Sequence, residues 1–512
     1  MIKNIKWLVL VSLTFIACND DEIVTTYDST DGLPLTAGTA DFSNYVALGD
    51  SFAAGFSDGA LFIEGQKGAY PNILAQQFAL VGGGDFTTPF MADNFGGLLL
   101  GGTPIQGVRL YFTGTAPASV AGAPTTEITN KLSGNFNNMG IPGAKSFHLL
   151  APNYGDASGI LRGTASPYFS RFSSSATTTV LADALAQTPT FFSLWIGGND
   201  VLGYALSGGD GTNPITPTAT FEGAYNSLAS QMAAGGRKGV VANIPYVDAL
   251  PHFTTVPFNP LTSKVLGLGN VAVGEATITA LNNQLYGPLK QALTAFGAGG
   301  RINLLSLTGS NPLLIKDESL TNLSAQLTAA FTPTLGASTA AVYGAIFGQA
   351  RQASATDLVL LPTQSVISSA PTASTSGLGF APTAPLDKFG ITYPLQDKHI
   401  LIPSEIQELQ TATDAYNVTI EAAAVANNLA IVDAKSLMNQ LKTGITRNNF
   451  TINTAFATGG AFSLDGFHPT PRGYALIANE FLKKINEKYG SNLNGVNLGN
   501  YRILFPRDAA NF

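Results

Sequence analysis

The sequence predicts an α/β protein in which a parallel sheet is covered by helices on both faces. Two observations predict this fold: short, nearly continuous apolar runs recur along the chain, and stretches with apolar residues at helical spacing separate them. Parallel strands have this appearance because helices cover both of their faces and leave neither to solvent. Ligands in such folds bind at the carboxyl ends of the strands, so functional residues are expected in the turns that follow the apolar runs.

The expected strands are apolar runs at positions 45–48, 191–196, 239–244 and 429–432. Each run is rich in Val, Ile, Leu or Phe and is followed by turn-forming or polar residues. The expected helices cover residues 221–234, 276–295, 403–428 and 473–489, where apolar side chains recur at helical spacing. Strands and helices alternate along most of this order, which is typical of a parallel sheet with helical connections.

The composition excludes several classes of protein. The 512 residues are 45% hydrophobic and 12% charged, which is enough apolar material for a large core and too much for a mainly disordered chain. The net charge is −7 and no basic stripe occurs, so nucleic acid is not expected as a partner. One cysteine and four histidines permit no internal disulfide and no multi-thiolate metal site. We expect neither a metal nor an organic cofactor.

Residues 1–17 are predicted to be a lipoprotein signal peptide. Two lysines precede an apolar run at 7–17, which is too short to span a bilayer because a spanning helix needs about 20 residues. Phe15-Ile16-Ala17-Cys18 resembles a bacterial lipobox, with Phe15 where Leu is usual, and this predicts cleavage before Cys18 and lipidation of that cysteine. The alternative is an ordinary signal peptide followed by an incidental cysteine. Lipidation implies an exported protein held by its N-terminal lipid at the outer membrane or the cell surface.

The remainder is predicted to be one folded domain with insertions. Polar residues 18–40 are expected to form a flexible tether. The domain covers 41–490, with insertions at about 52–135 and 254–399, and residues 491–512 form a C-terminal extension. Both insertions lack repeats and the strand–helix rhythm, so we expect them to decorate the core, although the second could fold as a cap.

Five residues that could take part in catalysis lie in short motifs at strand ends or beside helices. These motifs are Gly49-Asp50-Ser51-Phe52, Gly143 at the end of Asn138-Met139-Gly140-Ile141-Pro142-Gly143, Asn199 in Gly197-Gly198-Asn199-Asp200, and Asp465-Gly466-Phe467-His468-Pro469. A serine hydroxyl is a poor nucleophile at neutral pH and needs a neighbouring base, a role that His468 could take. Asp465, three positions earlier, could hold the other ring nitrogen and stabilise the imidazolium. The set suits acyl transfer.

Acyl transfer also needs hydrogen-bond donors for the oxyanion of the tetrahedral intermediate. The backbone N–H groups of Ser51 and Gly143 and the side-chain amide of Asn199 would supply them. Losing one such donor typically lowers the rate by about 10²–10³. Each motif alone is a common turn, and only their combination and order favour a catalytic site.

Together the motifs resemble the GDSL (SGNH) hydrolase family, whose blocks centre on Ser, Gly, Asn and His. The resemblance implies a three-layer, flavodoxin-like fold and a serine hydrolase acting on esters. It implies a triad of Ser51, His468 and Asp465, and an oxyanion hole of Ser51, Gly143 and Asn199. Phe52 departs from the Leu of the name-giving motif. The 92 positions from Ser51 to Gly143 and the 266 from Asn199 to Asp465 exceed those of compact members, so the substrate of a compact relative does not transfer.

We therefore expect a lipase- or esterase-like hydrolase acting on small-molecule, lipid or glycan esters. Acyl esters of lipids or small alcohols rank first, carbohydrate O-acetyl groups second, and the competing class is a non-catalytic surface lipoprotein that binds a glycan or partner. The oligomeric state is left open. The apolar groups at 98–100 and around Tyr343 and Phe347 could line an acyl pocket or form a lid, but small insertion cores are favoured.

Other titratable residues near these motifs are expected to be structural. They are Asp50, Asp200, Asp433, His148, His252 and His399. The two aspartates beside site residues stabilise turns in this interpretation, and none of the three histidines has a nearby His or Cys partner in the sequence.

Overall fold

The computed structural model describes residues 32–508. The predicted signal peptide and Cys18 lie outside the described residues, as does most of the predicted tether. At its end, the Thr36 backbone N–H donates to the Asn492 side-chain oxygen (2.7 Å) and the Thr39 N–H to the Tyr489 carbonyl (2.8 Å). Residues 36–39 are therefore attached to the folded body. Among the described residues, no helix is both long enough and apolar enough to cross a membrane.

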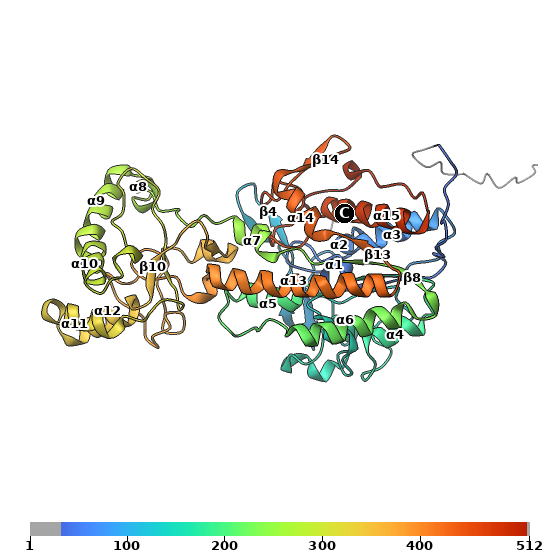
Figure 1. Ribbon diagram of the computed structural model, residues 1–512, viewed down its shortest axis with the longest axis horizontal. Coiled ribbons are helices and arrows are strands. Elements are labelled where there is room, and N and C mark those ends of the chain that lie inside the picture. The colour runs from blue at the N-terminus through green and yellow to red at the C-terminus, as the bar shows by residue number, and fades with distance from the viewer. Residues whose placement is uncertain (1–31, 509–512) are drawn as a thin grey trace, which may run out of the picture.

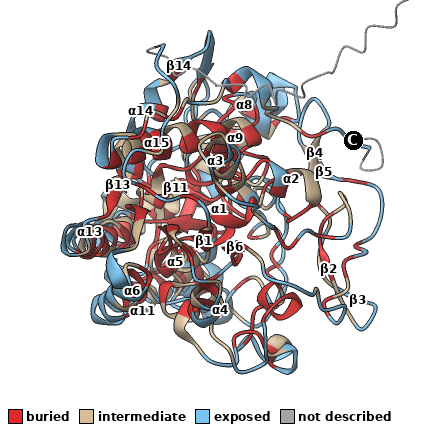
Figure 2. Cartoon of the chain, turned by 90° about the vertical axis from the view of Figure 1, so that its right-hand side faces the viewer, coloured by how far each residue is buried: buried red, intermediate tan, exposed pale blue. Residues whose placement is uncertain are grey.

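A parallel five-stranded sheet forms the centre of the molecule, in the order β13-β8-β7-β1-β6. The strands are β1 (Tyr45–Gly49), β6 (Asn138–Gly140), β7 (Phe191–Trp195), β8 (Lys238–Ala242) and β13 (Ala430–Val432). Every residue of β1 and β7 is buried, as Figure 2 shows for the interior. The four strands expected from apolar runs are present. The edge strand β6 has the sequence Asn-Met-Gly and carries no apolar run that could have predicted it.

Helices cover both faces of the sheet, which confirms the predicted α/β fold (Figure 1). One layer holds α4 (Val180–Ala186), α6 (Thr218–Met232) and α13 (Pro403–Ala426). The other holds α3 (Tyr70–Ala79), α14 (Ala434–Thr443) and α15 (Pro471–Tyr489). Helix α3 lies inside the segment expected as the first insertion. Its apolar face is nevertheless buried against α15, so the helix is part of the main core.

Local sequence sets the ends of α15, the helix that follows the Asp465–His468 motif. The Thr470 hydroxyl accepts the Gly473 N–H (3.0 Å) and caps the N-terminus, while Pro471 occupies the first turn, where no N–H is needed. Gly490 ends the helix in the left-handed region (φ 70°). Tyr474 and Phe481, on the predicted apolar face, are fully buried.

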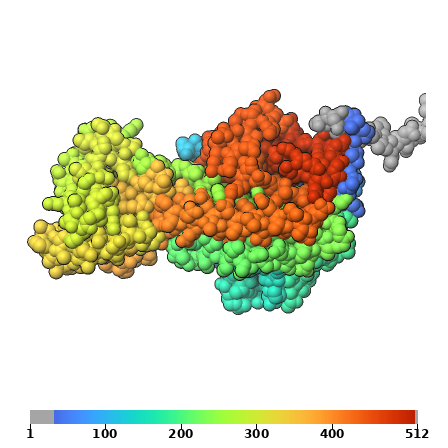
Figure 3. Space-filling view, viewed as in Figure 1, coloured from blue at the N-terminus to red at the C-terminus, as the bar shows by residue number. Residues whose placement is uncertain are grey.

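Residues from about 254 to 402 form a lobe that projects from the body (Figures 1 and 3). Its helices are α8 (Ser263–Leu266), α9 (Val271–Leu281), α10 (Gly287–Ala295), α11 (Ser324–Leu335) and α12 (Ala337–Phe347), and its strands include β9 (Leu314–Lys316) paired with β10 (Ala350–Gln352). The lobe has a hydrophobic cluster of its own, separate from that of the body. The single helix expected at 276–295 is divided by a π-helical turn at Asn282–Tyr286, because Pro288 lacks the N–H that continuous α-helix would use.

The rest of the first insertion lies beside the β6 edge of the sheet, where the Thr87 carbonyl accepts the Asn138 N–H (3.0 Å). It contributes α2 (Ile63–Lys67) and two short hairpins, formed by β2 (Leu98–Leu100) with β3 (Thr103–Gln106) and by β4 (Leu110–Phe112) with β5 (Pro117–Ser119). Leu98 is fully buried in the main core, so this segment decorates the body rather than forming a separate unit. In the C-terminal extension, Leu498 and Phe505 are buried.

Candidate active site

Ser51 lies where β1 turns into a one-turn helix, α1 (Ser51–Ala54). The Asp50 side chain caps this helix by accepting the Phe52 N–H at 3.0 Å. As the first residue of α1, Ser51 has a backbone N–H with no acceptor inside the helix. The turn therefore presents the hydroxyl and the N–H of Ser51 together at the carboxyl edge of the sheet.

Asp465 and His468 form a close side-chain pair. Nδ1 of His468 lies 2.8 Å from Oδ2 of Asp465. The other carboxylate oxygen accepts the backbone N–H groups of Phe467 (3.0 Å) and His468 (2.9 Å), and Oδ2 also accepts the Gly59 N–H (2.9 Å). Burial by itself would raise the pKa of Asp465, but attraction to His468 and these hydrogen bonds outweigh it and lower the pKa to about 2. The ionised carboxylate holds the proton of His468 on Nδ1 and leaves Nε2 as the basic nitrogen.

Aromatic contacts place the His468 ring beside α1. Its centroid lies 4.5 Å from the Phe56 ring and 5.7 Å from the ring of Phe52, the neighbour of Ser51. The buried Tyr474 hydroxyl donates to the Phe56 carbonyl at 2.8 Å, which ties α15 to the end of the α1 turn. The β1–α1 turn and the loop before α15, 414 positions apart in the sequence from Ser51 to Asp465, are thus packed against each other.

Asn199 and the Gly143 loop are joined by direct hydrogen bonds. Asn199 is the first residue of α5 (Asn199–Leu206), and its side-chain amide donates to the Ala144 carbonyl at 3.0 Å. The next residue, Asp200, accepts both the N–H (2.8 Å) and the hydroxyl (2.9 Å) of Ser146. One amide hydrogen of Asn199 is used in this way, and the second meets no acceptor among residues 32–508, which leaves it available to a ligand. Asp200 has the structural role expected from the sequence.

The backbone conformation at position 143 favours glycine, although there is space for a larger side chain. The φ of Gly143 is 78°, in the left-handed region, while a Cβ built on it would meet no atom within 4 Å. Among residues 32–508, its N–H donates to no backbone or side-chain acceptor. The loop therefore exposes an unused N–H next to the Asn199 amide.

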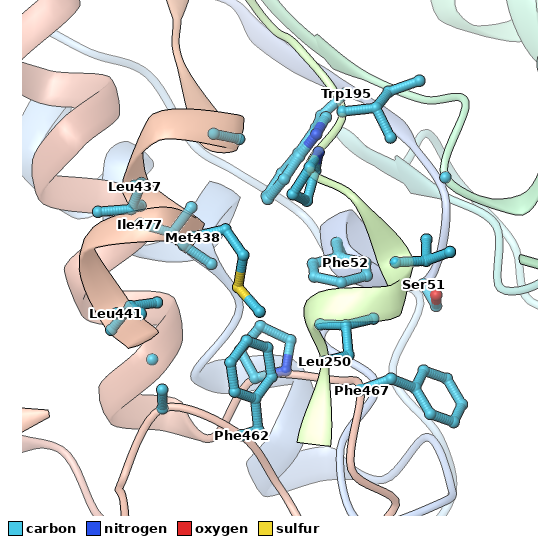
Figure 4. A pocket seen from close by; sticks show the side chains of 18 of the residues that line it. Ser51, Phe52, Trp195, Leu250, Leu437, Met438, Leu441, Phe462, Phe467 and Ile477 are labelled. Carbon is cyan, nitrogen blue, oxygen red and sulfur yellow. The ribbon is translucent and has the colours of Figure 1, made fainter. Parts of the chain in front are cut away.

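A deep apolar cavity opens beside Ser51 (Figure 4). Ser51 lies on one side of it, and Leu437, Met438 and Leu441 of α14 lie on the opposite side. The lining also includes Phe52, Trp195, Asn199, Leu202, Ile244, Leu250, Phe462, Phe467 and Ile477. This wall could not be recognised from the sequence. Its only local signal is the apolar spacing 437, 438 and 441 in α14, which any helix packed on a core also shows.

Three of the residues expected to be structural stabilise backbone near the site. The Asp433 carboxylate accepts the Ser436 N–H (2.9 Å) and so caps α14. Burial raises the pKa of Asp50 to about 7, and its oxygen is occupied by the capping hydrogen bond. His252 lies closer to the site than expected, because its Nδ1 is 3.1 Å from the Asp465 carbonyl oxygen and supports the backbone of that loop. Leu98–Leu100 in β2 and Phe347 in α12 line no part of the cavity beside Ser51.

Comparison with known proteins gives one match. Residues 45–318 and 339–481, well over half of the chain, match the family model described as GDSL-like Lipase/Acylhydrolase. The matched ranges contain all five motif residues, Ser51, Gly143, Asn199, Asp465 and His468. Searches of curated proteins and of solved structures each return no match.

Proposed function

Because the chain belongs to the GDSL-like lipase/acylhydrolase family, we propose that it hydrolyses carboxylic esters with Ser51 as nucleophile. The observation that carries the proposal is the buried Asp465–His468 pair, packed through Phe52 and Phe56 against the turn that presents Ser51. A carboxylate with a lowered pKa, held on one nitrogen of an imidazole beside a helix-terminal serine, is the arrangement that serine activation requires.

In the first half-reaction, Oγ of Ser51 attacks the ester carbonyl carbon while Nε2 of His468 takes the hydroxyl proton. Asp465 remains ionised and stabilises the imidazolium. The negative charge that develops on the carbonyl oxygen is met by the N–H groups of Ser51 and Gly143 and the free amide hydrogen of Asn199. Collapse of the intermediate expels the alcohol, which receives its proton from Nε2 and leaves an acyl-serine.

In the second half-reaction, Nε2 of His468 removes a proton from water, which attacks the acyl-serine through the same kind of intermediate. The acid leaves, and the proton returns to Oγ of Ser51. Every step uses groups of this chain, and the atoms balance as one ester and one water giving one alcohol and one acid.

The apolar cavity supports an acyl group longer than acetyl. Its wall of Leu437, Met438, Leu441 and neighbouring aromatic side chains offers an acyl chain a surface removed from water. Each methylene buried there would contribute about 0.8 kcal/mol to binding. We therefore place acyl esters of lipids or small alcohols ahead of carbohydrate O-acetyl esters, whose acetyl group would leave such a cavity unused.

The test uses protein beginning after Cys18, its Ser51→Ala variant, and Ser230→Ala as a matched control on the exposed side of α6. All three are assayed on p-nitrophenyl esters from acetate to palmitate and labelled with a fluorophosphonate. We expect turnover and labelling in the parent and the control, neither in Ser51→Ala, and an optimum beyond acetate. Absence of turnover and of labelling in the parent would instead favour the non-catalytic binding lipoprotein.

The location is a separate proposal. We propose that Cys18 is lipidated and holds the exported protein at the outer membrane or cell surface, since the sole cysteine follows a lipobox-like stretch. Metabolic labelling with a palmitate analogue checks this proposal, and a Cys18→Ser variant that is labelled equally well would refute it.

A further inference from the structure

Three carboxylates converge where the lobe joins the body. Glu318 follows β9 in the lobe, Asp397 begins a short 3₁₀ turn (Asp397–His399), and Glu405 lies in the first turn of α13. One oxygen of each lies within 4.8 Å of the others. Glu318 and Asp397 belong to the lobe and Glu405 belongs to α13, so the cluster is created where the lobe packs on that helix.

Direct ion pairs do not neutralise this cluster in the described part of the chain. Among residues 32–508, none of the three carboxylates forms an ion pair with Lys, Arg or His, although Lys316 lies near enough to Asp397 to attract its carboxylate.

Glu405 supplies an independent indication of a ligand. Its side chain is 4% exposed, and Oε2 accepts the Ile402 N–H at 2.8 Å. Its Oε1 is buried without a hydrogen-bond partner in the described part of the chain. A buried carboxylate oxygen without a hydrogen-bond partner destabilises the fold, and a ligand bound to Glu405 in this cluster would remove that cost.

The backbone closes over Glu405 in a way that only glycine allows. Gly209, just after α5, has a φ of 74°, and a Cβ at this position would overlap Oε1 of Glu405. A Cβ at Gly208 would overlap the Asp397 carbonyl oxygen. The turn that follows α5 (Asn199–Leu206) therefore lies directly against the Glu405 side chain and the backbone of Asp397.

We propose that Glu318, Asp397 and Glu405 bind a divalent cation, with Ca²⁺ as the best match, and that this ion fastens the lobe to the body. Carboxylate oxygens are the ligands that Ca²⁺ prefers, at 2.3–2.6 Å from the ion. Ca²⁺ tolerates irregular arrangements of oxygen ligands, whereas Mg²⁺ demands near-ideal octahedral geometry and usually retains several waters, so carboxylates gathered from three separate segments suit Ca²⁺ better. The alternative occupant is a proton, because both Asp397 and Glu405 face Glu318 closely enough to share one.

The test is thermal unfolding and calorimetric titration of the purified protein after treatment with EDTA. At a Ca²⁺ concentration about 100 times Kd, a chain of this size should gain about 3 °C in Tm, with a smaller gain from equal Mg²⁺. Glu405→Gln and Glu318→Gln should abolish the heat of binding and the Ca²⁺-dependent gain. Glu421→Gln, on an exposed turn of the same helix, should retain both.

Two outcomes would overturn the proposal. One is the absence of Ca²⁺ binding in the parent; the other is binding that persists unchanged in Glu318→Gln. Because the Glu318 side chain is exposed, this variant should fold as the parent does, and a loss of binding in it would report on the site itself. If the cluster shares a proton, Glu405→Gln should be as stable as the parent or more stable, with or without EDTA. Repeating the titration on Ser51→Ala separates this site from the proposed hydrolysis, since the ion should bind whether or not the protein cleaves esters.

Discussion

Replacing Asp465 by Asn should abolish activity by moving a proton on His468. Both oxygens of Asp465 are surrounded by donors: Oδ1 faces the N–H groups of Phe467 and His468, and Oδ2 faces the Gly59 N–H and Nδ1 of His468. An Asn amide must turn its NH₂ toward one of these sides. Turned toward the Oδ2 position, the NH₂ group opposes only the Gly59 N–H, because Nδ1 of the ring can accept a hydrogen bond from the amide when the ring proton moves to Nε2. Nε2 would then carry the proton and could not take one from Ser51.

The size of the effect follows from the lost tautomer and the lost charge. Loss of the correct tautomer in a serine hydrolase lowers kcat by about 10⁴. The lowering of the Asp465 pKa from 3.8 to about 2 corresponds to about 2 kcal/mol of folding free energy at neutral pH. Gly59 is exposed, so water can take the place of the lost carboxylate oxygen at its N–H. We therefore expect a folded variant that is less stable by about 2 kcal/mol and almost inactive.

The assay compares kcat/KM on a p-nitrophenyl ester, with urea unfolding to verify the fold. Asp433→Asn is the matched control, since Asp433 also follows a strand but caps α14. We expect it to lose about 1 kcal/mol of stability at most and to keep kcat/KM within about threefold. A folded Asp465→Asn protein with more than a tenth of the parent activity would refute the triad, above all if Asp433→Asn were inactive.

Three further predictions concern the cavity, the oxyanion loop and pH. Met438→Trp should fill part of the cavity and shift the chain-length optimum downward: excluding two methylenes costs about 1.6 kcal/mol, or about 15-fold in kcat/KM on long esters, with acetate little changed; equal losses on all esters would contradict an acyl pocket there. Gly143→Ala should lower kcat by about 10–10³ through its left-handed φ of 78°, while the Kd of a substrate-analogue inhibitor stays similar; unchanged kcat would remove this loop from the oxyanion site. For Asp50, burial raises the folded pKa to about 7, above the unfolded value near 3.8, so its stabilising contribution is complete below pH 3.8 and is lost as the pH rises through 7. Asn keeps a side chain that can cap α1 but cannot ionise, so the stability of Asp50→Asn relative to the parent, measured by urea unfolding, should be higher at pH 8 than at pH 5. An equal difference at both pH values would show that burial does not raise the pKa of Asp50.

The central sheet could be predicted because its strands are local features. The runs at β1, β7, β8 and β13 are apolar throughout, and strands buried on both faces need no partner to be recognised. β6 could not be predicted, because Asn-Met-Gly lacks the apolar run of a buried strand and is held in the sheet by pairing with β1. Helix α3 was assigned to an insertion for the same kind of reason, since only its burial against α15 places it in a layer.

The candidate site divides in a similar way. Asp465 and His468 could be paired from the sequence because three positions of separation bring both side chains into one turn. Ser51, Gly143 and Asn199 could be placed at strand ends, and parallel strands end at one edge of a sheet. The apolar wall of the cavity could not be predicted, since Trp195, Leu250, Met438 and Phe462 come from separate elements and apolar residues of this kind fill every core.

By itself the sequence determined the fold class, the order of the motifs and the chemistry they suit, because apolar runs, turn residues and short-range spacing act locally. Tertiary structure alone decided which distant segments meet. It packed the Phe56 ring on His468, formed the cavity between α14 and Ser51, and gathered Glu318, Asp397 and Glu405 at the base of the lobe. These arrangements depend on how helices and loops far apart in the chain dock on one another. No single stretch of sequence carries that information, because each residue in them would look the same on any buried face or polar loop.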